Sequence, residues 1–223
     1  MVKVKICGIT TLDDALTASR AGADMLGLNF FPKSPRYLEP DAARELADAL
    51  RKELGMACPL LVGVFVNEIV SKVSVTMEKV GLNFAQLSGD ESGEMLRELR
   101  GIGFKAIRPR SQAEAVEDAA YFGQFAPTDE RAPSLLLDAY NPKLYGGTGE
   151  QASIETAVAV RERSSRMMLA GGLTPENVAL RIAAVQPWGV DVASGVEGET
   201  PGRKDAEKVV AFISSVRSAT ISL

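Results

Sequence analysis

The stretch Val2-Lys3-Val4-Lys5-Ile6-Cys7-Gly8-Ile9-Thr10 begins as an apolar run and ends in a thiol, a glycine and a helix start. A mainly apolar run is typical of a parallel strand that is buried on both faces. The amphipathic segment after Thr10 has the period of a helix, so the whole stretch predicts one strand–helix unit of an α/β fold. A glycine beside Cys7 would let a ligand approach the strand tip closely.

The same strand–helix pattern recurs eight times along the chain. The predicted strands are residues 2–7, 25–30, 60–66, 84–87, 104–108, 134–138, 167–170 and 189–193. The predicted helices are residues 13–21, 41–53, 68–80, 91–99, 112–122, 154–163, 175–184 and 205–216. Eight such units predict a closed (β/α)8 barrel, with residues 1–223 forming a single domain near the lower size limit of that fold. A doubly wound open sheet is the alternative, but the first turn, Cys7-Gly8-Ile9-Thr10, lacks the Gly-x-Gly-x-x-Gly pattern of a dinucleotide-binding sheet.

Several helix starts carry capping signals. Thr10 followed by Asp13, and Thr11 followed by Asp14, both fit a capping box before the first helix. Thr174-Pro175 places a cap and then a proline at the first helical position of the seventh helix. These signals predict where the two helices begin.

Composition limits the possible function classes. The chain has 223 residues, 46% hydrophobic and 24% charged, with a net charge of −4 from 25 basic and 29 acidic residues. That balance speaks against a nucleic-acid partner, and no apolar segment is long enough to span a membrane or to act as a signal peptide, so a cytoplasmic protein is expected. Two cysteines make a disulfide framework unexpected. The absence of histidine excludes Ser-His-Asp and Cys-His catalysis, removes the commonest metal ligand, and leaves no predicted metal site.

Cys7 and Asp138 are the candidate catalytic residues, because the C-terminal ends of barrel strands carry function. Lys5 projects to the same side of its strand as Cys7, and together with the nearby helix start it could lower the pKa of the thiol. Asp138 follows an apolar run, and a carboxyl shielded from water suits a general acid. The plainer interpretations are a buried apolar filler for Cys7 and a turn or cap residue for Asp138. Cys58 precedes a strand and is expected to be inert.

Glycine-rich turns follow the seventh and eighth strands. Gly171 and Gly172 lie in the turn after the seventh strand, and Ser194 and Gly195 lie in the turn after the eighth. Many barrels hold a phosphate group at these two positions with backbone N–H groups, although glycines also serve ordinary turns. The glycine-rich segment 146–149 could be a lid over the ligand, a further anion contact or a flexible surface loop.

Arg36 and Asp191 are candidate ligand contacts. Arg36 lies in a proline-stiffened loop, where its guanidinium fork could bind a carboxylate or simply face solvent. Asp191 is flanked by valines in the eighth strand and should point into the barrel mouth, where a buried carboxylate needs a partner. That partner could be a ligand or Lys5.

Taken together, these tips resemble the phosphoribosylanthranilate isomerase family of tryptophan biosynthesis. The matching segments are residues 5–10, 31–36, 62–67, 86–91, 137–138, 146–149, 170–173, 190–197 and 201–205, in the family's order. The resemblance implies a (β/α)8 barrel and a cofactor-free, metal-free Amadori rearrangement of N-(5-phosphoribosyl)anthranilate, a phosphorylated aminosugar, to 1-(2-carboxyphenylamino)-1-deoxyribulose 5-phosphate.

The resemblance also implies a role for each candidate residue. Asp138 would protonate the ribose ring oxygen, and Cys7 as thiolate would remove the C2 proton. Arg36 would hold the anthranilate carboxylate and Asp191 would contact the anthranilate nitrogen. The phosphate would lie on Gly171, Gly172, Ser194 and Gly195. The protein is expected to be a monomer or a homodimer, and the sequence does not distinguish these two states.

Two positions depart from the family pattern. Ser88 stands where the family usually has histidine, and it cannot carry the same charge or reach. The segment after Gly149 lacks the family's usual apolar-acid-Trp sequence. Two alternatives therefore stay open: an isomerase of another phosphorylated aminoribose, and a catalytically silent barrel that binds a sugar phosphate.

Overall fold

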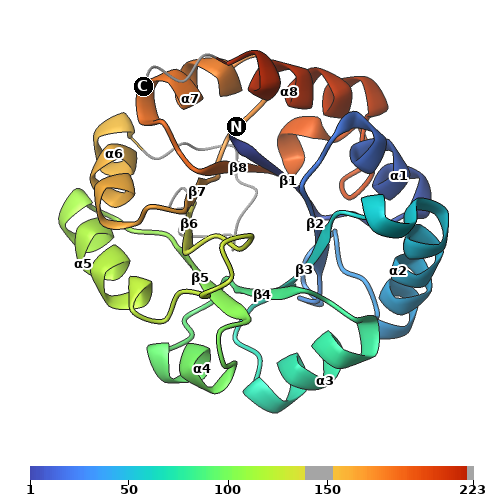
Figure 1. Cartoon of the computed structure of the whole chain (residues 1–223), viewed down its shortest axis with the longest axis horizontal. Coiled ribbons are helices and arrows are strands. Elements are labelled where there is room, and N and C mark those ends of the chain that lie inside the picture. Colours follow the sequence, from blue (N-terminus) through green and yellow to red (C-terminus); the bar gives the residue numbers. More distant parts are fainter. Residues whose placement is uncertain (139–152, 220–223) are drawn as a thin grey trace.

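The computed structural model describes residues 1–138 and 153–219, and these form a closed barrel of eight parallel strands inside a ring of helices (Figure 1). The strands are β1 (Lys3–Cys7), β2 (Met25–Asn29), β3 (Leu60–Phe65), β4 (Phe84–Leu87), β5 (Gly103–Ile107), β6 (Leu135–Leu137), β7 (Met167–Leu169) and β8 (Gly189–Val192). All eight predicted strands exist, with ends displaced by at most one residue. The predicted closed barrel is confirmed, and the open-sheet alternative is wrong.

The barrel closes where β1 pairs with β8. Lys5 is in register with Met25 on β2 at one side and with Asp191 on β8 at the other. Consecutive strands pair in chain order around the rest of the circle. The first and last strands of the chain are thus direct neighbours, and the seam between them carries two of the candidate residues.

The helices form the outer layer. They are α1 (Leu12–Ala21), α2 (Pro40–Leu54), α3 (Val70–Val80), α4 (Gly93–Glu98), α5 (Gln112–Gly123), α6 (Ile154–Arg163), α7 (Val178–Val185) and α8 (Ala206–Ser218), with short 3-10 turns η1 (Gly55–Ala57) and η2 (Ser194–Val196). Thr11 caps α1 by accepting a hydrogen bond from the Asp14 N–H. Thr10 instead donates to the Gly202 carbonyl, so of the two predicted capping residues only Thr11 caps the helix.

Two of the helices that begin later than the sequence predicts, α7 and α4, have a side-chain cause for the delay. Asn177 accepts from the Thr174 N–H and donates to the Gly172 carbonyl, so residues 174–177 form a turn and α7 starts at Val178. Glu91 turns back to bind the backbone N–H groups of Asn67 and Gly89, which keeps it in the loop before α4.

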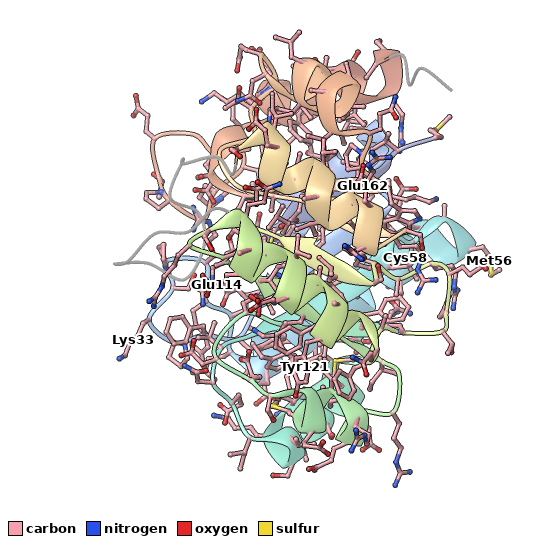
Figure 2. The ribbon with its side chains drawn as sticks, turned by 90° about the vertical axis from the view of Figure 1, so that its left-hand side faces the viewer. Lys33, Met56, Cys58, Glu114, Tyr121 and Glu162 are labelled. Atoms are coloured by element: carbon pink, nitrogen blue, oxygen red, sulfur yellow. The ribbon has the colours of Figure 1, made fainter. Side chains whose placement is uncertain are left out.

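The barrel interior and the layer under the helices hold separate apolar clusters. The interior is filled by large side chains, including Phe84, Phe104, Leu136 and Met168. The outward faces of the strands pack against the helices. Figure 2 views the barrel from the side, with Lys33 at one end and Met56 and Cys58 at the other. Within the described residues, no helix is long and apolar enough to cross a membrane.

Candidate active site

A cavity of about 310 Å³ opens at the end of the barrel where the strands finish. That volume is within the range of small-molecule sites. Cys7, at the tip of β1, and Asp138, directly after β6, both line this cavity. The two predicted catalytic residues therefore lie at the same mouth, although 131 residues separate them in the sequence. Arg36, Asp191, Ser88 and Arg108 line the same cavity.

Lys5, Cys7 and Asp191 form a buried group on the seam between β1 and β8. The Lys5 ammonium has no solvent exposure and donates to an Asp191 carboxylate oxygen at 2.9 Å. The charge of Lys5 also acts on the Cys7 side chain and favours its thiolate. The sequence left open whether Asp191 would meet a ligand or Lys5; it pairs with Lys5 and also lines the cavity.

The pKa of the Cys7 thiol is set by opposing effects. Burial raises this pKa above its ordinary value, the Lys5 ammonium lowers it, the Asp191 carboxylate raises it and the Lys204 ammonium lowers it, with a net rise. The sequence led us to expect a lowered pKa from Lys5 and the α1 start. That expectation is wrong for the unliganded protein, because removing the thiolate from water outweighs the neighbouring cations. Lys5 itself keeps its charge: burial lowers its pKa, but Asp191 and Cys7 raise it above the ordinary value.

A second, smaller recess of about 40 Å³ adjoins the cavity. It is lined by the four glycine-rich turn residues that the sequence assigns to phosphate: Gly171, Gly172, Ser194 and Gly195. Gly171 and Gly172 both adopt a positive φ, a conformation that favours glycine. A Cβ at Gly195 would overlap the Leu173 carbonyl oxygen, so only glycine lets the two turns approach. The recess and the cavity share Asp138, Asp191 and Ala193, so they form one continuous site.

Arg36 reaches the cavity from the loop after β2, but one edge of its guanidinium is already occupied. Its Nε and Nη2 atoms donate to the two carboxylate oxygens of Glu197 at 2.7 and 2.8 Å. Lys204, almost fully buried, donates to the same carboxylate at 3.1 Å and to the Ala193 carbonyl at 2.9 Å. A Cβ at Gly8 would overlap the Arg36 side chain, which therefore lies directly across the tip of β1.

The tip of β4 contributes Gln86 and Ser88. The Gln86 amide nitrogen donates to the Ser88 hydroxyl at 3.1 Å, and both side chains are buried and line the cavity. The Gln86 amide oxygen is buried and has no hydrogen-bond partner among the described residues. Ser88 thus occupies the position where the sequence places it, at the wall of the site.

Glu197 and Lys204 are the site residues that sequence reasoning did not assign. Both lie in segments that the resemblance covers, at residues 190–197 and 201–205, but no local pattern indicates that Glu197 meets an arginine 161 positions away. Residues 146–149, interpreted as a possible lid, lie outside the described residues. Cys58 lies at the opposite end of the barrel from Lys33, which lines the cavity, as Figure 2 shows. Among residues 1–138 and 153–219, no group of three or more acidic or cysteine side chains could hold a metal ion.

Comparison with known proteins identifies the family. Residues 4–215 match the family model of N-(5'-phosphoribosyl)anthranilate (PRA) isomerase. The chain belongs to the N-(5'-phosphoribosyl)anthranilate isomerase family. The N-(5'-phosphoribosyl)anthranilate isomerase of Trichlorobacter lovleyi is 43% identical over 219 residues, covering 98% of this chain and 100% of that protein.

Two solved structures of this family superpose closely on the chain. Mutually generated monomers of the dimeric Thermotoga maritima isomerase give a TM-score of 0.81 at 35% identity, covering 97% of this chain and 99% of that one. A structure of phosphoribosyl anthranilate isomerase in complex with reduced 1-(o-carboxyphenylamino)-1-deoxyribulose 5-phosphate gives a TM-score of 0.80 at 36% identity, covering 97% of this chain and 99% of that one. The predicted family, fold, isomerase activity and place in tryptophan biosynthesis are confirmed by these matches.

Proposed function

We propose that this chain converts N-(5'-phosphoribosyl)anthranilate to 1-(2-carboxyphenylamino)-1-deoxyribulose 5-phosphate, with Asp138 as general acid and Cys7 as general base. The observation that carries these roles is the shared cavity: one thiol and one carboxyl, from β1 and from the end of β6, border the same space. With no histidine in the chain, these are the two groups at the mouth best suited to proton transfer.

The proposed reaction begins at the ribose ring. Asp138 gives a proton to the ring oxygen, the bond from that oxygen to C1 breaks, and the anthranilate nitrogen forms a Schiff base with C1. The Cys7 thiolate then takes the proton from C2, and the electron pair of that C–H bond forms the C1–C2 double bond of an enolamine. As that bond forms, the electron pair of the C1–N double bond returns to nitrogen. C1 then takes back the proton that Cys7 removed, and the C2 hydroxyl gives its proton to Asp138 as it becomes a ketone. Substrate and product have the same composition, so each proton taken or given is returned before release.

The remaining groups bind and orient. We assign the phosphate to the recess formed by Gly171, Gly172, Ser194 and Gly195, because αL glycines present backbone N–H groups to an anion there. The ribose would then lie beside Asp138 and Asp191, which border both the recess and the cavity. This order places the anthranilate ring toward Arg36, whose guanidinium suits its carboxylate. No step in this scheme requires a metal or a cofactor.

The test is turnover of freshly made phosphoribosylanthranilate, followed by loss of its fluorescence. Cys7→Ala and Asp138→Asn should each lower kcat by about 10²- to 10⁴-fold, the usual contribution of general acid–base catalysis, while circular dichroism and the unfolding midpoint stay near those of the wild type. Full turnover in either variant would overturn that residue's role. A wild-type protein that binds the reduced product analogue without turnover would instead favour the silent barrel, and a substrate panel would expose a preference for another phosphorylated aminoribose.

Three further expectations remain proposals. We propose that residues 1–223 act as one domain, that the protein works in the cytoplasm, and that it is a monomer or a homodimer. The dimeric relative from Thermotoga maritima motivates the second assembly state. Light scattering of the purified protein across a dilution series distinguishes the two.

A further inference from the structure

We infer that Glu197 is a positioning residue that holds the Arg36 guanidinium so that one of its edges recognises the carboxylate of the substrate. This inference rests on the proposed function, because it assigns how the carboxylate end of that substrate is read. Glu197 follows η2 in the loop after β8, and Arg36 lies in the loop after β2. The two side chains meet at the rim of the cavity, which Arg36 lines.

The geometry of the pair decides which guanidinium edge is left. A guanidinium carries five N–H donors in a planar fork. Glu197 takes the Nε–Nη2 edge through both of its carboxylate oxygens, at 2.7 and 2.8 Å. No further acceptor contacts the Arg36 guanidinium within residues 1–138 and 153–219. The Nη1–Nη2 edge is therefore available for a second bidentate contact, and a carboxylate is the group that matches it.

The pair is fixed from several sides. The side chains of Glu197 and Arg36 are only 6% and 13% exposed, and Lys204 holds the Glu197 carboxylate from a third position. Arg36 also passes so close to Gly8 that a Cβ there would overlap it. With its side chain held by Gly8 on one side and Glu197 on another, Arg36 has little freedom to rotate. A rigid donor loses less entropy on binding than a mobile one, which is what a positioning contact provides.

The charges of the cluster favour an anionic ligand. One carboxylate, Glu197, faces two cations, Arg36 and Lys204, so the group carries a net positive charge at the cavity rim. Burial alone would raise the Glu197 pKa, but its hydrogen bond with Arg36 and the charge of Lys204 bring that pKa below the ordinary value. Glu197 is therefore ionised at neutral pH, and the surplus positive charge is left for the ligand.

A plainer role for this cluster is a clamp between two loops, and the experiment separates the two roles. Binding is measured by calorimetry for reduced 1-(o-carboxyphenylamino)-1-deoxyribulose 5-phosphate and for the matched analogue that lacks the ring carboxylate. In Glu197→Gln the affinity for the carboxylate-bearing ligand should fall by about 10- to 100-fold, the scale of a displaced binding group, while the analogue changes less than about 3-fold. An equal loss for both ligands would show a clamp and overturn the inference.

A double variant tests whether Glu197 acts through Arg36. If it does, Arg36→Met and Arg36→Met/Glu197→Gln should bind the carboxylate-bearing ligand with the same affinity, since the second change has nothing left to displace. Additive losses would overturn the inference. Asp24→Asn is the matched control: Asp24 also joins two cations, Lys3 and Arg217, but does not line the cavity, so it should lower stability without changing either affinity.

Kinetics provide the readout that separates this inference from the proposed function. Glu197→Gln should raise KM far more than it lowers kcat, because it disturbs binding rather than proton transfer. If the wild type does not turn over phosphoribosylanthranilate, the proposed function fails, yet the binding comparison of the two ligands still decides the role of Glu197.

Discussion

Two buried lysines, Lys5 on β1 and Lys105 on β5, differ in what surrounds them. The Lys5 ammonium donates to the Asp191 carboxylate, and its charge acts on the Cys7 side chain; Asp191 and Cys7 both line the cavity. The Lys105 ammonium lies under the helices and donates to Glu91 and to the backbone carbonyls of Leu87, Gly89 and Ala106. Burial lowers the pKa of Lys105 more than Glu91 raises it, whereas the pKa of Lys5 rises above its ordinary value.

This difference separates a structural charge from a functional one. Lys105 is satisfied by Glu91 and by carbonyl groups from the end of β4, from the turn after β4 and from β5, so its ammonium ties that turn to the two strands. Lys5 instead interacts with two side chains, Asp191 and Cys7, that both line the cavity and can meet a ligand there. Burial alone therefore does not indicate function; the chemistry of the partners does.

Replacing Lys5 should have the largest effect, since it changes both stability and chemistry. Lys5→Met leaves the Asp191 carboxylate buried without its cation, at a cost of about 3–5 kcal/mol in unfolding free energy. It also removes the main charge that favours the Cys7 thiolate, so the pKa of Cys7 should rise further. Because kcat/KM increases as the thiol ionises, the rising limb of the plot of kcat/KM against pH should move to higher pH. Chemical denaturation and a pH–rate profile measure the two effects.

Asp191→Asn is the opposing variant for the same group. Asp191 raises the pKa of Cys7, so replacing it with a neutral amide should move the rising limb to lower pH. Lys204 and Arg36, the other charges that act on Cys7, stay unchanged in both variants. Limbs that move in the same direction in the two variants would contradict the assignment of this ionisation to Cys7. The rate at which iodoacetamide alkylates Cys7, measured as a function of pH in both variants, gives the same comparison without requiring turnover.

Replacing Lys105 should change stability alone. Lys105→Met leaves Glu91 buried without its cation and three carbonyls without their donor, which should cost about 3–5 kcal/mol in unfolding free energy. Folded protein should retain its pH–rate profile, because Lys105 does not line the cavity. A profile displaced like that of Lys5→Met would erase the distinction between the two lysines. Denaturant titration measures the loss of unfolding free energy. An activity assay at several pH values, under conditions in which the variant is fully folded, tests whether the pH–rate profile is unchanged.

Lys3 provides the smallest effect and the matched reference. It is two residues before Lys5 on the same strand and pairs with Asp24 at 2.9 Å, but its side chain is 43% exposed. An ion pair of that exposure contributes about 0–1 kcal/mol. Lys3→Met should therefore cost no more than about 1 kcal/mol and leave the pH–rate profile unchanged. If Lys3→Met lowered the unfolding free energy as much as Lys5→Met does, the effect would depend on location in β1 rather than on burial beside Asp191.

The strands and the site location could be predicted because their signals are local. A strand covered on both faces must be apolar, so the runs ending at Cys7 and before Asp138 are visible in sequence, and parallel strands bring their ends to one mouth. The start of α7 could not be predicted, because it depends on the Asn177 side chain, which accepts from the Thr174 N–H, donates to the Gly172 carbonyl and so keeps residues 174–177 in a turn.

The electrostatics of the site could not be predicted for a different reason. The raised pKa of Cys7 depends on how completely the thiol is buried, which no residue type encodes. The contact of Arg36 with Glu197 depends on the positions of two loops at opposite ends of the sequence. Strand alternation predicts that the Asp191 side chain points into the barrel mouth, where its partner could be a ligand or Lys5. Only the register of β1 with β8 shows that Lys5 lies beside it.

The seam between β1 and β8 makes the catalytic group dependent on the order of synthesis. Lys5 and Cys7 are synthesised more than 180 residues before Asp191, which lies on the strand that closes the barrel. A nascent chain lacking β8 therefore has no counter-ion for the lysine and no second wall for the thiol. An N-terminal fragment should be inactive even where its strands have paired, and activity should arise in a single step when the ring of strands is completed.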